Sequence, residues 1–370
     1  MARTSSLGDF VRVRTGKLDA NAAHENGKYP FFTCSKEPLA INTYSFDCEC
    51  VLLAGNGEFH VSYYSGPFDA YQRTYVIESL DVERLSVSYL YYFMRYYSAE
   101  LRKLSVGGVI KFIKLGNIKD APIPIPPISE QRRIVDLISR AEGIVRLRRE
   151  AEKKAAELIP ALFLDMFGDP AANPKGWPSA AIGDLFDVKG GKRLPKGAPY
   201  SEEPTALRYI RATDIKADRI NERNLVFLFP EVQKSISRYV VAAEDVVITI
   251  AGTIGVAAPI GSSLSGVNLT ENAAMIRPKN QARTNAIFFS SLMNSAFVQR
   301  QIEALTGRVT IGKLALERIR LIEIRLPPLP LQQEFGEKLA MVRSIQSQQS
   351  NATVKAKATF DALLTQAFSG

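Results

Sequence analysis

The sequence of this chain repeats itself after about 200 residues. Residues 125–131 read IPPISEQ and residues 326–332 read LPPLPLQ, at a distance of 201 positions. The same distance places ALFLDMFG (161–168) on ALLTQAFS (362–369) without a gap. Two copies of one unit must each fold in a similar way, so every local feature can be interpreted twice. The sequence therefore predicts a tandem duplication.

The starts of the two copies also correspond. LGDFVRVRTGK (7–17) pairs with IGDLFDVKGGK (182–192) at a distance of 175, and residues 53–55 pair with 250–252 at 197. The growing distance means that the second copy holds about 26 additional residues. We expect most of them between residues 191 and 251.

Each copy opens with short runs of β-forming residues separated by glycines. The runs are ECVLLA, FHVSYY and TYVI in the first copy, and VVITIAG, GVAAPI and AAMIRP in the second. Such runs are typical of strands joined by turns and bulges. A helix is expected over 86–104 (SVSYLYYFMRYYSAELRKL), where the aromatic residues fit a helix core better than a base-stacking surface. Its counterpart is expected over 285–305.

A proline-rich segment then leads into a long helix in each copy. Apolar residues recur there at three- and four-residue steps, as in a coiled-coil seam. Arg148 and Gln349, which are 201 positions apart, interrupt both seams at the same place. These matching breaks favour helices that pack on each other, antiparallel if the copies are related by a pseudo-twofold axis; the alternative is that each packs on its own domain. The expected seam residues are Ile134, Leu137, Ala141, Ile144, Ala151, Ala155, Leu158 and Leu162, and Phe335, Leu339, Val342, Ile345, Ala352, Ala356, Phe360 and Leu363.

The repeat and the helices together predict an α+β fold with two β-rich domains. A chain of 370 residues can give each domain its own hydrophobic core. Pro160 lacks a backbone donor, so we expect it to kink or end the first helix near Ile159. The expected boundaries are a first domain at 1–127, a first helix at 128–168, a second domain at 169–328 with a linker at 169–178, and a second helix at 329–370.

The positive charge lies on the domains rather than on the helices. The formal net charge is +9, and residues 129–168 and 330–370 together contribute only +2 of it. Basic domains joined by a nearly neutral spacer are suited to contact with a polyanion such as nucleic acid. No apolar run reaches the ~18 residues of a membrane span, and the first residues carry no apolar signal core. With three cysteines, Cys34, Cys48 and Cys50, expected to be buried strand residues rather than metal ligands, we expect a cytoplasmic protein.

Catalytic motifs are hard to find in this sequence. The two histidines, His24 and His60, both lie in the first copy, which leaves little for a zinc site or a histidine-based triad. GRVTIGKL (307–314) resembles a phosphate-binding loop, but Leu314 stands where Ser or Thr must hold magnesium. GDPAANP (168–174) lacks the second proline and the aromatic residue of an amino-methyltransferase motif and fits a linker. We therefore expect no catalytic residue, cofactor site or metal site on this chain.

The order of segments resembles one known family. The carrying motifs are the GDxxxVxxGK domain starts, YSFD…LLAGNG, GPFDAYQRTYVI, APIPIPPISEQRRIV and the helix end ALFLDMFGDP. Together they are similar to the specificity subunit of type I restriction–modification enzymes, along essentially the whole chain. The second copy departs from the pattern with LPLQQ at its helix start, as does Pro160 in the first, which bears on helix geometry.

The resemblance implies a mechanism. Each β-rich domain would be a target recognition domain that reads one half of an interrupted DNA sequence, and the helices would set the separation and carry two methyltransferase subunits. Those subunits would bind S-adenosylmethionine, and restriction/translocase subunits would use ATP and Mg²⁺. The chain would be a non-catalytic, DNA-binding subunit of a restriction system for DNA methylation and cleavage. The alternatives are a specificity module of a related defence or fused type II-like system, a self-sufficient methyltransferase or nuclease with unrecognised motifs, and a scaffold that never touches DNA.

Polar and basic residues near the glycine turns are the candidate DNA contacts, although a solvated surface charge is as good an interpretation of any single one. In double-stranded DNA, base edges in the major groove are read by such side chains. In the first copy the candidates are Lys17, Asn56, Tyr63, Tyr64, Arg73, Lys111 and Lys114, and in the second they are Lys192, Arg193, Lys196, Arg211, Thr253, Arg308 and Lys313.

Overall fold

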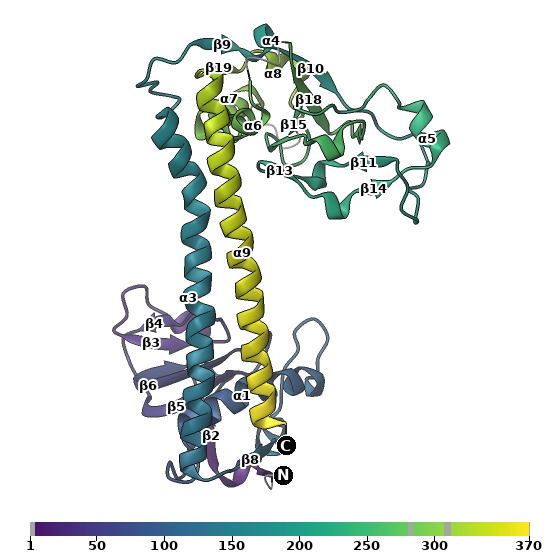
Figure 1. Cartoon of the computed structure of the whole chain (residues 1–370). Helices are drawn as coiled ribbons and strands as arrows, with labels where there is room; N and C mark the ends of the chain where they lie inside the picture. The colour runs from purple at the N-terminus through teal and green to yellow at the C-terminus, as the bar shows by residue number, and fades with distance from the viewer. Residues whose placement is uncertain (1–3, 280–283, 307–311, 370) are drawn as a thin grey trace. The chain divides into compact units, whose positions relative to one another are not determined.

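The computed structural model describes residues 4–279, 284–306 and 312–369. The chain divides into two compact units, one formed by Met1–Glu152 with Gln348–Gly370 and the other by Lys153–Ser347 (Figure 1). Each unit contains a β-rich domain and one end of each of two 40-residue helices, α3 (Ile128–Phe167) and α9 (Leu329–Phe368). No helix among the described residues is both long and apolar enough to cross a membrane.

The first unit is built on a six-stranded sheet in the order β2-β7-β5-β6-β3-β4. Neighbouring strands are antiparallel except β3 and β6, which are parallel. A separate two-stranded antiparallel sheet is formed by β1 and β8. The elements are β1 (Thr4–Ser6), η1 (Leu7–Asp9), β2 (Val11–Thr15), η2 (Ala20–Ala22), β3 (Tyr29–Phe32), β4 (Leu39–Ile41), β5 (Phe46–Ala54), β6 (Val61–Ala70), β7 (Thr74–Ser79), α1 (Val87–Leu104), α2 (Leu115–Lys119) and β8 (Pro122–Pro124).

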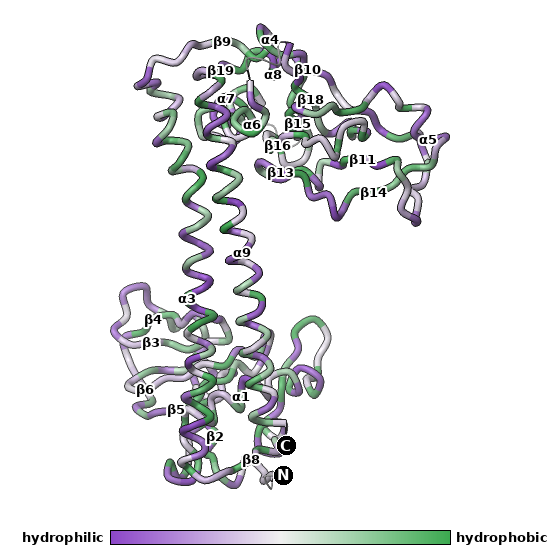
Figure 2. The backbone as a smooth tube through the Cα atoms, in the orientation of Figure 1, coloured by the Kyte–Doolittle hydropathy of each residue, from purple (hydrophilic) through white to green (hydrophobic). Residues whose placement is uncertain are grey.

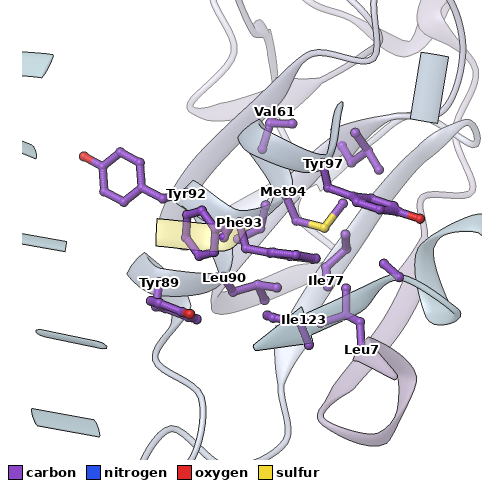
Figure 3. Packing of buried hydrophobic residues seen from close by; sticks show 14 of the residues in the cluster. Leu7, Val61, Ile77, Tyr89, Leu90, Tyr92, Phe93, Met94, Tyr97 and Ile123 are labelled. Atoms are coloured by element: carbon purple, nitrogen blue, oxygen red, sulfur yellow. The ribbon is translucent and has the colours of Figure 1, made fainter. Parts of the chain in front are cut away.

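Helix α1 contributes more buried residues to the core of this unit than any other element does. Strand residues alternate between the two faces of the sheet, so Val51 and Leu53 face the α1 side while Leu52 packs in a smaller cluster on the other face. Figure 3 shows Leu90, Phe93 and other α1 side chains packed against residues of the sheet and of β8. The aromatic run 89–97 is therefore core, as the sequence predicted.

The second unit holds a four-stranded sheet in the order β10-β18-β15-β16. Two small sheets, β14-β11-β17 and β12-β13, are added to it, and β19 pairs with β9. The strands are β9 (Ser179–Ala181), β10 (Phe186–Gly190), β11 (Arg208–Ile210), β12 (Ile215–Lys216), β13 (Arg219–Ile220), β14 (Val226–Phe227), β15 (Val246–Thr249), β16 (Ala257–Pro259), β17 (Asn268–Leu269), β18 (Ala273–Pro278) and β19 (Glu323–Arg325). The helices are α4 (Ile182–Leu185), η3 (Ala212–Asp214), η4 (Glu222–Asn224), α5 (Pro230–Ser235), η5 (Ser262–Leu264), α6 (Ala286–Met293), α7 (Ala296–Thr306) and α8 (Leu316–Arg320).

The duplication is confirmed at the level of strand register. Val11 pairs with Ser79 between β2 and β7, and Phe186 pairs with Pro278 between β10 and β18, so the equivalent strands differ by 175 and 199 positions. The pairings of β1 with β8 and of β9 with β19 match at distances of 175 and 201. The order β2-β7-β5-β6 is thus repeated as β10-β18-β15-β16.

Two local expectations from the repeat were wrong. Ala54 pairs with Thr74 and Thr249 pairs with Ala273, so residues 53–55 correspond to 248–250 and not to 250–252. The error arose because both stretches are apolar runs that end in Ala-Gly, whereas hydrogen bonding to the neighbouring strand sets the register. The helix expected over 285–305 is interrupted at Asn294, whose backbone N–H bonds to carbonyls of α6 and ends that helix.

The long helices run antiparallel within each unit. In the first unit, Ile138 on α3 shares a core cluster with Phe360 on α9. In the second unit, the Phe163 and Phe335 rings are 5.7 Å apart, and Gln346 Nε2 on α9 donates to the Ala155 carbonyl at 2.6 Å. In each unit the N-terminal part of one long helix thus faces the C-terminal part of the other.

Helix α3 does not end at Pro160, as one expectation had it, but continues to Phe167. The last turns are held because Phe163, Met166 and Phe167 are buried in the core of the second unit. This apolar burial offsets the backbone hydrogen bond that the proline removes.

The expected seam was wrong at five positions. Ala151 is exposed, and Leu137, Ile144, Leu158 and Ile345 are about half exposed. Apolar residues stand side by side at 137/138, 144/145 and 158/159, so spacing alone fits two neighbouring stripes. Figure 2 shows hydrophobic and hydrophilic segments alternating along α3. The stripe that packs on the domains and on α9 includes Ile138, Val145 and Ile159. The other eleven expected seam residues are buried or half-buried, as are the two interruptions Arg148 and Gln349. The eleven are Ile134, Ala141, Ala155, Leu162, Phe335, Leu339, Val342, Ala352, Ala356, Phe360 and Leu363.

A buried glutamine joins each long helix to the shorter helix of its domain. The backbone N–H of Ser86, the N-cap of α1, donates to Gln131 Oε1 at 3.0 Å, and that of Asn285, the N-cap of α6, donates to Gln332 Oε1 at 2.9 Å. Each side-chain amide donates in turn to a proline carbonyl five residues earlier. The two repeats are therefore equivalent at this junction. Equivalent residues are 199 positions apart in the sequence for the short helices and 201 positions apart for the long ones.

Candidate nucleic-acid interface

Four loops of the first unit lie next to one another at one end of the six-stranded sheet. Gln72 N donates to the Leu18 carbonyl at 2.9 Å, and Gly55 N donates to the Arg73 carbonyl at 2.7 Å. Gly57 N then donates to the Lys111 carbonyl at 3.0 Å. We call the loops 16–18, 55–57, 71–73 and 106–114 the first loop row.

A glycine allows the loops 16–18 and 71–73 to approach so closely. A Cβ atom at Gly16 would lie 1.7 Å from the carbonyl oxygen of Ala70, which no side chain could tolerate. Its repeat equivalent, Gly191, would place a Cβ 2.1 Å from the carbonyl oxygen of Thr270. The glycine in each GK motif is thus required by backbone contact, and the lysine that follows it is carried on this loop.

The first loop row carries five of the seven contacts predicted for this repeat, namely Lys17, Asn56, Arg73, Lys111 and Lys114. The four cations are exposed, and none of them has an ion-pair partner within the residues that the structure describes. Exposed cations without a carboxylate partner are free to neutralise phosphates. Asn56 is half-buried and bridges to Phe112, which fixes its loop.

Tyr63 and Tyr64 lie elsewhere, in the middle of β6. The hydroxyl of Tyr63 donates to Glu49 Oε1 at 2.7 Å, and this hydrogen bond raises the pKa of Tyr63 to about 12. The ring of Tyr64 packs at 5.1 Å from Phe32 and 5.5 Å from Phe68. The structure therefore does not bring these two residues into the first loop row.

The second unit repeats the backbone of this row. Gly191 N donates to the Ala273 carbonyl, Ile250 N to Asn272, and Leu314 N to Ile250, at 3.0, 2.8 and 2.9 Å. The first unit makes the last two contacts from Gly55 to Arg73 and from Ile113 to Gly55. We call residues 191–193, 250–253, 270–272 and 312–314 the second loop row.

The second loop row carries four predicted contacts, Lys192, Arg193, Thr253 and Lys313, all exposed. Lys196 follows in an exposed loop, and Arg308 lies outside the described residues. The Lys192 ammonium group lies 5.7 Å from the centre of the Tyr239 ring.

A groove of about 490 Å³ lies beside this row. Arg193 lines this groove and donates through Nε to Glu271 Oε1 at 2.6 Å, with most of its side chain exposed. Burial raises the pKa of Glu271, but hydrogen bonds, chiefly from Arg193, outweigh it and leave that pKa lowered. An exposed pair of this kind contributes little stability, so Arg193 can exchange its carboxylate for another acceptor at small cost. The groove is lined by Arg193, Leu194, Ala198, Tyr200, Tyr209, Arg211, Ala212, Thr213, Thr270, Glu271 and Asn272.

Arg211 is held more firmly in this groove. Its guanidinium group makes two hydrogen bonds to the buried carboxylate of Asp214 and a third to the Asn224 carbonyl at 2.7 Å. The hydrogen bond to Asp214 raises the pKa of Arg211. Removing Arg211 from Asp214 would leave a buried carboxylate unpaired. The main role of Arg211 is therefore to hold the wall of the groove in place.

Nine of the eleven residues that line the groove were not predicted from the sequence, and Asn272, Tyr200 and Thr213 are among them. Asn272 is the repeat equivalent of Arg73 at a distance of 199, and this equivalence is the signal that could have found it. Tyr200 and Thr213 belong to the segment that the second repeat adds, and no counterpart in the first repeat points to them.

The comparisons with known proteins agree with this architecture. The family model described as "Type I restriction modification DNA specificity domain" matches residues 2–157 and 174–356, one match in each repeat. The chain belongs to this family. The matched residues cover most of the chain, and the type I specificity function expected from the sequence is confirmed.

Relatives and solved structures extend along the whole chain. The "Type I restriction enzyme EcoDI specificity subunit" of Escherichia coli is 28% identical over 100% of this chain and 88% of that protein. The S subunit of a type I restriction–modification system from M. genitalium shares the fold with a TM-score of 0.61 and 16% identity, covering 99% of this chain and 95% of that one. A chain from a structure of type I R-M system assembly and conformational transition shares the fold with a TM-score of 0.64 and 19% identity. The match covers 99% of this chain and 97% of that one.

Proposed function

We propose that the two loop rows read the two halves of an interrupted sequence in double-stranded DNA. The observation that carries this proposal is that both rows are built on the same backbone hydrogen bonds but present different side chains. Arg73 in the first row is replaced by Asn272 in the second. Arginine pairs well with guanine and asparagine with adenine in the major groove, so equal frames with unlike side chains suit two unlike half-sites.

Within each row we assign the lysines to phosphates and the arginine, asparagine and threonine side chains to base edges. Lys17, Lys111 and Lys114 are exposed, and a lysine ammonium group on its long stem suits phosphate contacts. Arg193 and Asn272 lie together on the wall of the groove, where a fork-shaped donor and an amide can be aimed at bases.

The chain would carry out no chemistry itself. We propose that two methyltransferase subunits bind S-adenosylmethionine, and that restriction/translocase subunits use ATP and Mg²⁺. An exposed apolar stripe on α3 supports a docking surface for a methyltransferase: Leu137, Ile144 and Leu147 are each at least 50% exposed. The assembly would act on DNA in the cytoplasm.

The DNA assignment is tested by measuring the affinity of the chain, bound to its methyltransferase, for target DNA over a range of salt concentrations. Neutralising several phosphates gives a steep negative slope of log affinity against log salt, about 0.9 per phosphate. Replacing the lysines of one row with glutamine should make the slope shallower. A flat salt response of the wild-type complex would contradict the proposed interface.

A further inference from the structure

The repeat equivalence of α1 and α6 exposes a difference between the two units. Tyr89 on α1 packs on Phe368 at 5.1 Å, and its equivalent Phe288 packs on Phe167 at 4.7 Å. The glutamine junctions described above fix the same alignment from the other side. One turn further along, Tyr92 corresponds to Ser291 and Arg95 to Asn294, while on the long helices Phe360 corresponds to Ile159.

In the first unit an arginine fills the space between α1 and the long helices at these positions. The guanidinium carbon of Arg95 lies 5.3 Å from the ring of Tyr91, 5.8 Å from that of Tyr92 and 5.0 Å from that of Phe360. Arg95 also forms an ion pair with Glu142 on α3 and donates to the hydroxyl of Tyr91. A planar cation stacked on rings and paired with a carboxylate is a stable combination away from bulk water.

In the second unit the same place is a cavity of about 280 Å³. Short side chains stand where the first unit has Tyr92 and Arg95, and no aromatic residue replaces Phe360. The mouth is open to solvent beside the exposed residues Pro160 and Leu164. The cavity is lined by Ile159, Pro160, Phe163, Leu164, Asp169, Pro170, Asp218, Ser291, Asn294, Ser295, Ala296 and Phe297.

The polar groups of this cavity suit a cation. The hydroxyl of Ser291 is buried and has no hydrogen-bond partner in the part of the chain that the structure describes. Asp218 Oδ1 accepts from Ser290 Oγ at 2.5 Å and from Asn294 Nδ2 at 2.8 Å, which holds the carboxylate at the wall. Asp169 adds a second carboxylate, and the described lining includes no lysine or arginine.

Arg343 forms a long ion pair with Asp218 and hydrogen-bonds to its backbone carbonyl. Its Nη2 donates to the Asp218 backbone carbonyl at 2.8 Å and lies 4.0 Å from Asp218 Oδ2. Arg343 is not among the lining residues. It is the repeat equivalent of Glu142, so the long helix supplies the opposite charge in the two units.

We propose that this cavity accepts an arginine side chain from another subunit, which takes the place that Arg95 fills in the first unit. The inference rests on the proposed function only in its source of the arginine, a methyltransferase subunit. A guanidinium group can stack against Phe163 or Phe297, bond to Asp218 and donate to the unpaired hydroxyl of Ser291 at the same time. A lysine ammonium is more strongly hydrated and has no flat face to stack.

The first test measures the binding of ethylguanidinium to the full chain by NMR titration. We expect saturable binding, with ethylurea, which has a similar shape but no charge, at least about tenfold weaker because a charge-assisted hydrogen bond is lost. Ser291→Tyr, which restores the side chain of the filled unit, should abolish binding. Asp218→Asn and Ser291→Ala should weaken it while keeping the cavity open.

Ser265→Tyr is the matched control, since Ser265 is exposed in the same unit and does not line the cavity. The melting temperature followed by the fluorescence of Trp177 shows whether each variant is folded. The proposal would be overturned if ethylguanidinium showed no saturable binding, or if it bound folded Ser291→Tyr as well as wild type. It would also be overturned if p-cresol, which has the shape of a tyrosine side chain, bound more tightly than ethylguanidinium.

The second test measures the affinity of the chain for its methyltransferase. Ser291→Tyr should weaken the complex at least about tenfold, and Ser265→Tyr should not. If the probe binds but Ser291→Tyr leaves this affinity unchanged, an arginine of that subunit is not the occupant and the proposal fails. DNA recognition by the assembled complex, measured separately, keeps this result distinct from a failure of the proposed function.

Discussion

Gln131 and Gln332 show how much of each repeat depends on a single side chain. Both glutamines are fully buried at the first turn of a long helix, and each accepts from the N-cap of the neighbouring helix while donating to a carbonyl before its own helix. An apolar residue of the same size would leave a buried donor and a buried acceptor without partners. Such groups cost more than the hydrogen bonds contributed.

Gln332→Met should therefore lower the free energy of unfolding of the second unit by about 1–3 kcal/mol. Gln333→Met is the matched control, since Gln333 is the exposed neighbour, and it should change stability by less than about 0.5 kcal/mol. The chain has one tryptophan, Trp177, whose Nε1 bonds to the Phe167 carbonyl at 2.9 Å, so urea unfolding followed by its fluorescence reports on this unit. Equal unfolding midpoints for the two variants would contradict the role of Gln332.

Arg73 gives a residue-level prediction for DNA. Arg73→Gln should weaken binding to the target, because the first row loses the donor that we assign to a base edge, while the slope of log affinity against log salt should change little. Arg12→Gln makes the same change of charge on an exposed residue in β2, outside the first loop row, and should leave both quantities unchanged. Binding is measured by fluorescence anisotropy in the presence of the methyltransferase, and equal affinity of the Arg73 variant and wild type would remove Arg73 from the interface.

At the scale of elements, neighbouring residues of α3 have opposite roles. Ile138 is 1% exposed in the core of the first unit, whereas Leu137 is 50% exposed on the apolar stripe. The first residue stabilises the fold, and we propose that the second contacts a methyltransferase.

Ile138→Ala should destabilise the first unit by about 2–5 kcal/mol because it leaves a cavity under α1. Leu137→Ala should cost less than about 0.5 kcal/mol but weaken association with the methyltransferase. Hydrogen exchange of the α1 amides measures the first effect and calorimetric titration the second. The assignment of the two faces is wrong if Leu137→Ala destabilises the unit as much as Ile138→Ala does.

The sequence predicted the elements better than their phase. Each β-run recurred in the second repeat, so β5, β7, β15 and β18 could be placed twice over, and α1 was predicted nearly to the residue. The face that α3 buries could not be predicted, because apolar residues stand side by side along it and tertiary contacts decide between them. The break at Asn294 was also missed, since it depends on a local cap and not on periodicity.

The candidate site was predictable only where a glycine turn marked it. Lys17 and Lys192 follow glycines that backbone contact requires, and both lie in the loop rows; their contact with DNA stays a prediction. Tyr63 and Tyr64 were misplaced because they lie within β6, where Tyr63 bonds to Glu49 and Tyr64 packs against Phe32 and Phe68. Tyr200 and Thr213 were missed because they lie in the segment that only the second repeat contains, and neither a repeat nor a motif predicts how that segment folds.

The long helices provide a prediction on the scale of the whole molecule. Positions 151 and 349 lie near the middle of α3 and α9, and four residues inserted after each add about one turn, ~6 Å, while roughly keeping the faces in phase. We expect the recognised sequence to gain one or two unread base pairs, since each rises ~3.4 Å, with both half-sites unchanged. Two-residue insertions would rotate each face by ~200° and should prevent assembly. An active four-residue variant with an unchanged spacer would show that the helices do not set the spacing.

The chain alone should neither methylate nor cut DNA. Purified protein incubated with DNA, S-adenosylmethionine, ATP and Mg²⁺ should show no turnover above buffer, and addition of the methyltransferase should restore methylation. Turnover by the chain alone, in a preparation shown by mass spectrometry to lack other subunits, would contradict the assignment of all chemistry to the partners.

The central claim, that each repeat reads its own half-site, is tested most directly by methylome sequencing of cells that express the chain with its methyltransferase. Wild type should give one motif of two different half-sites separated by a fixed number of unread bases. Arg73→Ala in the first row should change or relax one half-site, and Asn272→Ala in the second row should change only the other. A single uninterrupted motif, or one in which both variants altered the same bases, would contradict the claim.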